Sequence, residues 1–223
     1  MKKQVLILSQ IVLLISALLF IISPRSLSAQ NITAHNTSKY LCNGRWEWTV
    51  FIQAPPKVLD GIRIVEYTLH PTFPNPVRKV NRIGDPRFPF GHTTIGWGTF
   101  EISIKVIFKN EEIRHLKHML TFEAPPVEDP LPIKPQNVAV SVGKNRWKWT
   151  VFIQGSSNVL DQIRCVEYTL HPTFPKPVQE VSERGTDSRA FGLSAIGWGT
   201  FQIRIRVFLR NGQVQELMHD LRF

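Results

Sequence analysis

A gapless internal repeat dominates this chain. Residues 44–122 align with residues 145–223 at a constant offset of 101 residues, and 43 of the 79 aligned pairs are identical. A repeat of this length means that one structural unit is built twice. We therefore expect two domains of the same fold.

The segments around the repeat set the domain boundaries. Residues 124–136 contain five prolines, which predicts an extended, semi-rigid linker. The stretch NVAVSVG that follows alternates apolar and polar residues, which is typical of an opening strand. We expect the domains to span 40–123 and 137–223.

The first 29 residues differ from the rest. Lys2 and Lys3 precede an apolar run over residues 5–22, and Pro24 and the small residues of 26–29 follow. This order predicts an export signal peptide. The apolar run also reaches the lower length of a membrane-spanning helix, so an uncleaved signal-anchor helix stays open. Both alternatives place the remaining chain outside the cytoplasm, either periplasmic or extracellular, or anchored to the membrane.

The formal net charge of +10 is partly carried by the N-terminal segment, through Lys2, Lys3 and Arg25. An exported protein meets little nucleic acid, so we expect no nucleic-acid partner. Acidic envelope or cell-surface polymers are the alternative counterpart of the charge, and solubility alone is the other explanation.

Only two cysteines occur, Cys42 and Cys165, and they lie at non-equivalent positions of the repeat. Cys165 replaces Ile64 in a strand pattern, which is typical of a small core residue. Whether the two cysteines pair is left open by the sequence.

Each copy reads as an all-β domain. Residues 46–52, 65–69, 100–108 and 116–122 alternate between apolar and polar side chains, the period of half-buried strands. Asn110, with Asn211 in the second copy, predicts the turn before the final strand. Several short strands in so few residues favour an antiparallel β-sandwich.

No catalytic constellation is repeated in both copies, so we expect no enzyme, cofactor or metal site. His115 could pair with His118 as metal ligands, but Glu216 stands in place of His115 in the second copy. His118 and its counterpart His219 sit in alternating strands, and we interpret them as structural.

Two repeated loops carry polar and aromatic tips. The first contains His70, Thr72 and Phe73 between prolines, and the second places Trp97 between two glycines. One hypothesis is that the aromatic residues only plug the end of the sandwich. The other is that two facing rings form a slot for a planar group such as an acylated amide, with a hydroxyl at its edge.

The segments WTVFI, VEYTLHPTFPNPVR, IGWGTFEISIKVIF and LKHML resemble a YEATS domain, most closely the prokaryotic branch of that family. The resemblance covers nearly all of each copy. It implies an immunoglobulin-like β-sandwich, and eukaryotic members read acylated lysine on histone tails by holding the acyl amide between two aromatic rings.

The resemblance also implies site residues. In the first copy Phe73 and Trp97 would be the walls, Thr72 the hydroxyl and His70 a brace, with Gly96 preceding the tryptophan. The corresponding residues of the second copy are His171, Thr173, Phe174, Gly197 and Trp198. Proline stands between the histidine and the threonine, where eukaryotic readers often carry an acid. Because an exported protein does not meet histones, the implied ligand is an acylated protein or an acylamino-bearing envelope component.

A second function class uses the surface instead of a pocket. Arg204, Arg206 and Arg210 alternate with apolar residues, which would place a basic stripe on the outer face of the second domain. In this alternative the chain is a structural or adhesion-like module that binds acidic envelope components, and the aromatic residues serve as packing.

Overall fold

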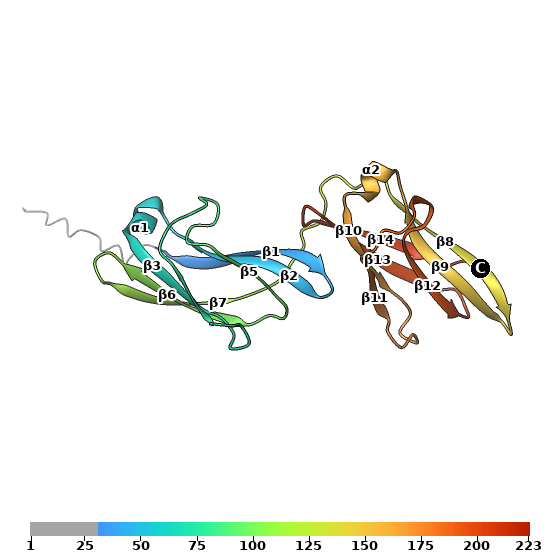
Figure 1. Cartoon of the computed structure of the whole chain (residues 1–223), viewed down its shortest axis with the longest axis horizontal. Helices are drawn as coiled ribbons and strands as arrows, with labels where there is room; N and C mark the ends of the chain where they lie inside the picture. The colour runs from blue at the N-terminus through green and yellow to red at the C-terminus, as the bar shows by residue number, and fades with distance from the viewer. Residues whose placement is uncertain (1–30) are drawn as a thin grey trace, which may run out of the picture.

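The computed structural model describes residues 31–223. The expected signal or anchor segment, residues 1–29, lies outside the described residues. Within 31–223, no helix combines the length and apolar character needed to cross a bilayer. The described chain forms two domains that follow one another along an elongated molecule (Figure 1).

Each domain packs a three-stranded sheet on a four-stranded sheet. In domain 1 the smaller sheet has the order β1 (Thr33–Cys42), β2 (Arg45–Gln53), β5 (His92–Gly96). The larger sheet has the order β4 (Val77–Val80), β3 (Ile62–Thr68), β6 (Glu101–Phe108), β7 (Ile113–Met119). All these strand pairs are antiparallel.

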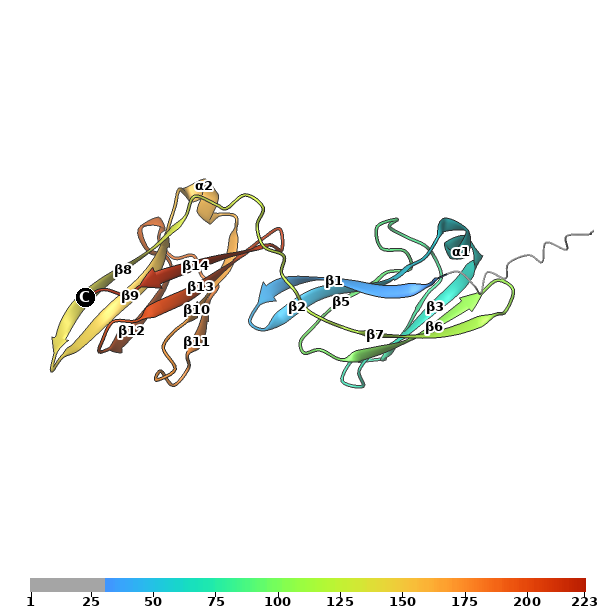
Figure 2. The ribbon, with the colours of Figure 1, turned by 180° about the vertical axis from the view of Figure 1, so that it is seen from behind.

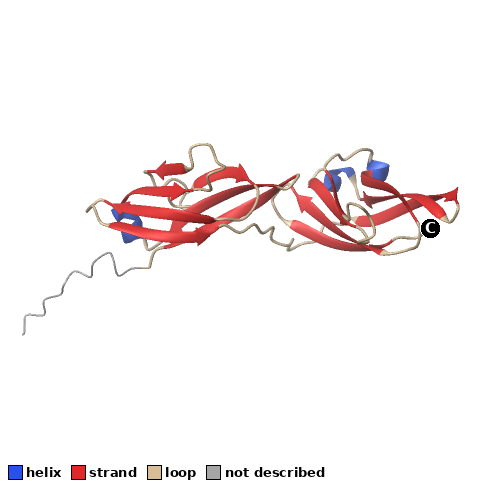
Figure 3. Cartoon of the chain, turned by 90° about the horizontal axis from the view of Figure 1, so that it is seen from below, coloured by secondary structure: helices blue, strands red, loops and turns tan. Residues whose placement is uncertain are grey.

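Domain 2 repeats this topology. Its smaller sheet contains β8 (Lys134–Gly143), β9 (Arg146–Gln154) and β12 (Ala190–Gly197). Its larger sheet contains β10 (Ile163–Thr169), β11 (Val178–Val181), β13 (Gln202–Leu209) and β14 (Val214–Asp220). The helical segments are short: α1 (Pro56–Gly61), α2 (Ser157–Leu160) and the 3-10 turn η2 (Asp187–Arg189) (Figure 3). The all-β prediction and the two sandwich-like units are confirmed.

The core of each domain is built by the predicted alternation. In domain 1 the buried faces of β2, β3 and β6 meet, with Trp48, Tyr67 and Ile104 at 1 % exposure or less. The hydroxyl of buried Tyr67 donates to the Phe90 carbonyl over 2.8 Å. Domain 2 repeats this bond between Tyr168 and Phe191 at 2.7 Å. Burial raises the pKa of both tyrosines, so each remains a donor across the working pH range.

The histidines interpreted as structural do link the two sheets. His118 on β7 is hydrogen-bonded through Nε2 to the Asn36 side chain on β1 at 2.8 Å, and His219 makes the same bond to Asn137. Asn36 also donates to the Thr121 carbonyl. The asparagine is the one residue that β1 and β8 share at equivalent positions, and this bond explains why.

Cys42 and Cys165 form a disulfide between the two domains, with their Cα atoms 6.3 Å apart. Cys165 is fully buried, as a core residue would be, but it is buried at the joint between the domains. The sequence left this pairing open because only the fold brings residues 123 apart in the chain together.

His92 is a half-buried histidine of domain 1 that has no counterpart in domain 2. Its ring packs against Trp48 and Tyr67 and its Nε2 has no hydrogen-bond partner. Burial lowers the pKa of His92, and the charge of Arg78 lowers it further. Leu193 occupies the equivalent position in domain 2.

We therefore expect acidification to destabilise domain 1 more than domain 2. A histidine whose folded pKa lies below its unfolded value of about 6.5 binds protons better when unfolded, so its contribution to stability is present above about pH 6.5 and lost below it. Thermal unfolding followed by NMR signals of each domain at about pH 7.5 and about pH 5 measures the difference. His92→Leu should remove it, and an unchanged pH dependence in that variant would contradict the assignment.

Candidate acyl-binding site

The loop between β3 and β4 is a closed turn that presents Thr72 and Phe73. Its ends are joined by the Leu69 amide donating to the Pro76 carbonyl at 2.9 Å, and the Phe73 amide donates to the His70 carbonyl at 3.0 Å. Prolines on both sides restrict the backbone further. The loop between β10 and β11 has the same two bonds, from Leu170 and Phe174.

His70 braces the threonine and does not itself line the cavity. Its Nδ1 lies 2.9 Å from the Thr72 hydroxyl and accepts the Thr72 amide at 3.3 Å. An Nδ1 that accepts carries no proton, so the hydroxyl donates to it and keeps its lone pairs free to accept. His171 and Thr173 repeat this arrangement, with the hydroxyl contact again at 2.9 Å. The site thus offers a hydrogen-bond acceptor of fixed direction.

The loop after β5 places the tryptophan in solvent. Trp97 and Trp198 are each 67 % exposed, so neither is the buried plug that one hypothesis allowed. Gly98 has φ +72°, a conformation that favours glycine and lets the chain turn beneath the ring. The buried tryptophans of the two cores are Trp48 and Trp149.

Gly96 is required by the close approach of Phe73. A Cβ atom at this position would lie 2.9 Å from Phe73 Cζ and 3.2 Å from Trp48 Nε1. At Gly197 the corresponding distances, to Phe174 and Trp149, are both 3.4 Å. The predicted glycine therefore stands behind the phenylalanine and brings that ring against the core.

These loops enclose one cavity of about 210 Å³ in each domain. The first is lined by Arg45, Thr72, Phe73, Pro74, Ile95 and Trp97. The second is lined by Arg146, Thr173, Phe174, Pro175, Ile196, Gly197 and Trp198. Pockets for drug-sized ligands measure about 300–1,000 Å³, so each cavity suits a small group.

Trp48 packs behind Phe73, one wall of the first pocket, on the core side of that ring. Its ring meets Phe73 edge to face at 6.1 Å and Phe100 at 6.0 Å. Trp149 meets Phe174 and Phe201 in the same way. The indole N–H of each buried tryptophan has no hydrogen-bond partner, although it is buried. The indole ring of each tryptophan therefore packs against the phenylalanines, while its N–H donor carries the free-energy cost of burial without a hydrogen bond.

Sequence reasoning missed the arginine at the mouth. Arg45 Cζ lies 6.0 Å from the centroid of the Trp97 ring, and Arg146 lines the second pocket. The available signal was that both copies keep arginine here, at a position exposed in both domains. A guanidinium at the rim makes each mouth positive.

Other candidate chemistry is weaker. Among residues 31–223, the only group of three possible metal ligands consists of Cys42, Cys165 and Glu180. Both sulfur atoms of this group belong to the disulfide.

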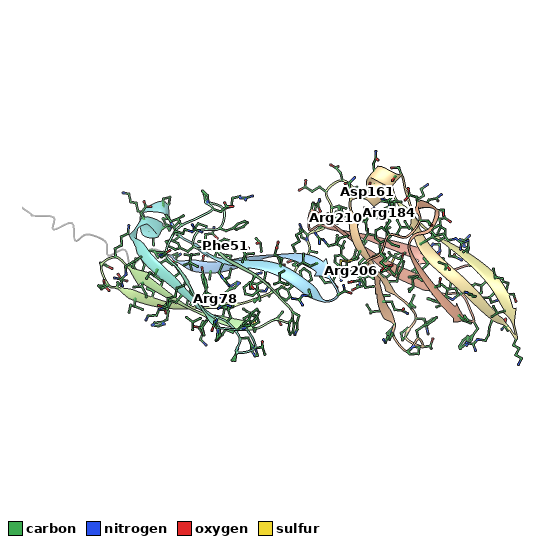
Figure 4. The ribbon with its side chains drawn as sticks, viewed as in Figure 1. Phe51, Arg78, Asp161, Arg184, Arg206 and Arg210 are labelled. Carbon is green, nitrogen blue, oxygen red and sulfur yellow. A yellow bond between two sulfur atoms is a disulfide. The ribbon has the colours of Figure 1, made fainter. Side chains whose placement is uncertain are left out.

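The proposed basic stripe is largely ion-paired. Arg204 contacts Glu216 at 2.7 Å, and Arg206 contacts Glu167 at 3.4 Å. Arg206 is labelled on the part of domain 2 nearest to domain 1, while Arg210 lies beside α2 and donates to the Asp161 carbonyl (Figure 4).

Comparison with known proteins identifies the repeated unit. The family model for the prokaryotic YEATS domain matches residues 46–121 and 147–222. The AF-9 homolog of Saccharomyces cerevisiae is 37% identical over 90 residues, which cover 38% of this chain and 37% of that protein. The AF-9 homolog of Eremothecium gossypii is 38% identical over 87 residues, covering 37% of this chain and 39% of that protein. The match thus spans well under half of these relatives.

Solved structures of the yeast relative are also similar. The AF-9 homolog Yaf9 aligns at 29% identity with a TM-score of 0.34, over 42% of this chain and 71% of that chain. The Yaf9 YEATS domain recognizing a succinylated H3 peptide aligns at 32% identity with a TM-score of 0.33, over 42% of this chain and 75% of that one. Since the family model matches both repeats and together they make up more than half of the chain, the chain belongs to the prokaryotic YEATS domain family, with two domains in tandem.

Proposed function

We propose that each domain binds an acylated amine of the acyl-lysine kind in its aromatic pocket, without catalysis. The observation that carries this proposal is the pairing of half-buried Phe73 with exposed Trp97 around one small cavity, repeated with the same residues in domain 2. We further propose that the sandwiches are immunoglobulin-like, which the packing of a three-stranded on a four-stranded sheet supports.

In this proposal the aromatic walls exclude water from the ligand, and the threonine hydroxyl forms a hydrogen bond with it. Phe73 and Trp97 desolvate a planar amide, which strengthens any hydrogen bond it makes. The Thr72 hydroxyl donates its hydrogen bond to His70 Nδ1, so its oxygen lone pairs are free to accept a hydrogen bond from the amide N–H of the ligand. By the family resemblance, the backbone N–H of Trp97 would be a further donor, to the acyl carbonyl.

Arg45 gives the pocket a means of discrimination. Unmodified lysine carries a positive charge that the guanidinium repels, whereas acylation removes this charge. The exposed setting makes the repulsion modest, since solvent screens it. The arginine therefore favours acylated over free lysine by charge, and the aromatic walls favour it by shape.

We also propose that the chain acts outside the cytoplasm, either exported or tethered through residues 5–22. The disulfide between Cys42 and Cys165 supports an oxidising compartment. The ligand would then be an acylated protein, or an envelope component that bears acylamino groups. The alternative, a basic surface for acidic partners, is less favoured because Arg204 and Arg206 already pair with acids.

Titration of the chain with acetyl-lysine, crotonyl-lysine and unmodified lysine peptides by NMR tests the pocket. We expect shifts around Thr72 and Trp97, and around Thr173 and Trp198, with the acylated peptides only. The double variant Trp97→Ala/Trp198→Ala should lose them, because both rings are exposed and their removal leaves the cores intact. Shifts that persist in this variant, or no shifts in the unmodified chain, would refute the proposal.

A further inference from the structure

The joint between the two domains is built from specific contacts in addition to the disulfide. Tyr40, near the tip of the β1–β2 hairpin, donates to Glu180 on β11 over 2.6 Å. The other Glu180 oxygen accepts the Asn43 amide at 2.6 Å, and Gly44 donates to the Tyr40 oxygen at 3.0 Å. Burial, and then the bond to Glu180, raise the pKa of Tyr40 to about 12, so it stays a donor. One carboxylate of domain 2 therefore holds the hairpin tip of domain 1.

Apolar packing surrounds these bonds. The rings of Tyr40 and Phe208 lie 4.4 Å apart, and both belong to a buried cluster that spans the joint. The cluster consists of Tyr40, Cys42, Cys165, Phe208 and Val214. Lys39 also packs over Gly212, where a Cβ atom would lie 3.3 Å from Lys39 Cγ. The domains are thus in close contact across a small core of their own.

The proline-rich segment strengthens this joint. Val214 of β14 donates to the Pro125 carbonyl at 2.8 Å and accepts the Val127 amide at 3.1 Å. The Leu131 amide donates to the Gln215 side chain at 2.8 Å. The linker therefore lies along domain 2 for most of its length and leaves the domains little freedom to swing.

The two copies differ at the joint and agree at the pockets. Ser141 and Gly143 occupy the positions of Tyr40 and Cys42, and Lys79 that of Glu180. Isoleucine replaces Cys165, Phe208 and Val214 in domain 1, at positions 64, 107 and 113. By contrast, every residue that lines the first pocket has an identical counterpart in domain 2. The repeat has thus been altered where the domains meet and kept where a ligand would bind.

The joint leaves one pocket-lining loop of each domain on the same side of the molecule (Figure 1, Figure 2). The loop between β3 and β4 and the loop between β10 and β11 project toward the same side in opposite views (Figure 1, Figure 2). The hairpins that carry Arg45 and Arg146 point the same way along the long axis (Figure 1). The loop that carries Thr173 and Phe174 is therefore displaced along the molecule from the loop that carries Thr72 and Phe73, and it projects to the same side (Figure 1, Figure 2).

We propose that the two pockets together recognise one extended polypeptide that carries two acylated lysines. This inference rests on the proposed function of each pocket. A rigid joint holds the second pocket near a ligand already bound in the first, so the second binding step becomes intramolecular. The orientation is fixed before binding, which reduces the entropy lost on association.

The fold also sets the spacing of the two lysines. We take the length of one domain from its ten-residue strand β8, which at about 3.3 Å per residue is roughly 33 Å. An extended peptide covers about 3.3–3.6 Å per residue, so about 10 residues should separate the acylated lysines.

Binding of acetyl-lysine peptides by calorimetry tests the inference. Three doubly acetylated peptides with about 4, about 10 and about 16 residues between the lysines are compared with a singly acetylated one. We expect one-to-one binding of the middle peptide with at least about a tenfold gain in affinity. Trp198→Ala should remove the gain. The triple variant Cys42→Ala/Cys165→Ala/Glu180→Lys, which removes both the cross-link and the carboxylate of the joint, should weaken the preference for one spacing.

The outcomes separate the two proposals. If the singly acetylated peptide binds but no doubly acetylated peptide gains affinity, or all spacings gain equally, the pockets act independently and this inference fails alone. If no acetylated peptide binds at all, the pocket function and the inference fail together.

Discussion

Replacing Trp48 with alanine is expected to lower the free energy of unfolding of domain 1 by about 3–5 kcal/mol. Trp48 is 1 % exposed and supports Phe73, Phe100 and His92 from below. A small domain is stable by only about 5–15 kcal/mol, so the variant loses a large share of the stability of domain 1. Because the two domains have separate main cores, domain 2 should keep its own transition.

Matched variants make this expectation specific. Trp97→Ala removes the same side chain from an exposed position of the same domain and should change stability by less than about 0.5 kcal/mol. Trp149→Ala should destabilise domain 2 as Trp48→Ala does domain 1. Urea unfolding followed by NMR signals of each domain measures all three. Equal effects of Trp48→Ala and Trp97→Ala would contradict the assignment of Trp48 to the core of domain 1.

The main strands of each domain could be predicted because they bury one face. Residues 46–52 and 100–108 alternate as they do because β2 and β6 face the core. Strand β1 lacks this signal. Its buried residues Tyr40 and Cys42 pack against domain 2, and the rest of the strand is at most half-buried. Its inward-facing positions 36 and 38 carry the polar residues Asn36 and Ser38, so the alternating burial of the strand has no matching alternation of apolar residues.

The aromatic walls of the candidate site, Phe73 and Trp97, could be predicted from the sequence, but the arginine at its mouth, Arg45, could not. Phe73 and Trp97 stand out because aromatic residues between prolines or glycines are unusual. Their meeting around one cavity depends on the fold, which brings the loop after β3 beside the loop after β5. Arg45 begins a strand and resembles any exposed charge there. Only its position over Trp97 separates it from other surface arginines.

The joint could not be predicted from the repeat, because the repeat is defined by residues that are identical in the two copies. Its residues are the ones that differ between the copies, scattered from Tyr40 to Val214. Each difference taken alone resembles an ordinary substitution between two copies of a repeat. Together they form a hydrogen-bonded and apolar contact that neither domain could make with a copy of itself, since Ser141, Gly143 and Lys79 lack the groups required.

Reducing the disulfide is expected to destabilise both domains by about 5 kcal/mol at most, because cross-linking residues 123 apart restricts the unfolded chain. When domain 1 alone unfolds, the disulfide and the docked linker hold both ends of its chain on domain 2. The freed segment then contains about 80 residues, against about 40 when domain 2 unfolds. A doubling of loop length is worth about 0.6 kcal/mol, so domain 1 should lose slightly more.

Urea unfolding with and without a phosphine reductant, followed by NMR signals of each domain, measures this effect. The reduced chain keeps both sulfur atoms in the joint, so packing is nearly unchanged and the loss reports the cross-link. Cys42→Ala/Cys165→Ala should reproduce the loss, with a further small term because both positions are buried. If the reduced and oxidised chains unfold at the same urea concentration, the contacts of Tyr40, Glu180 and Phe208 hold the joint without help from the disulfide.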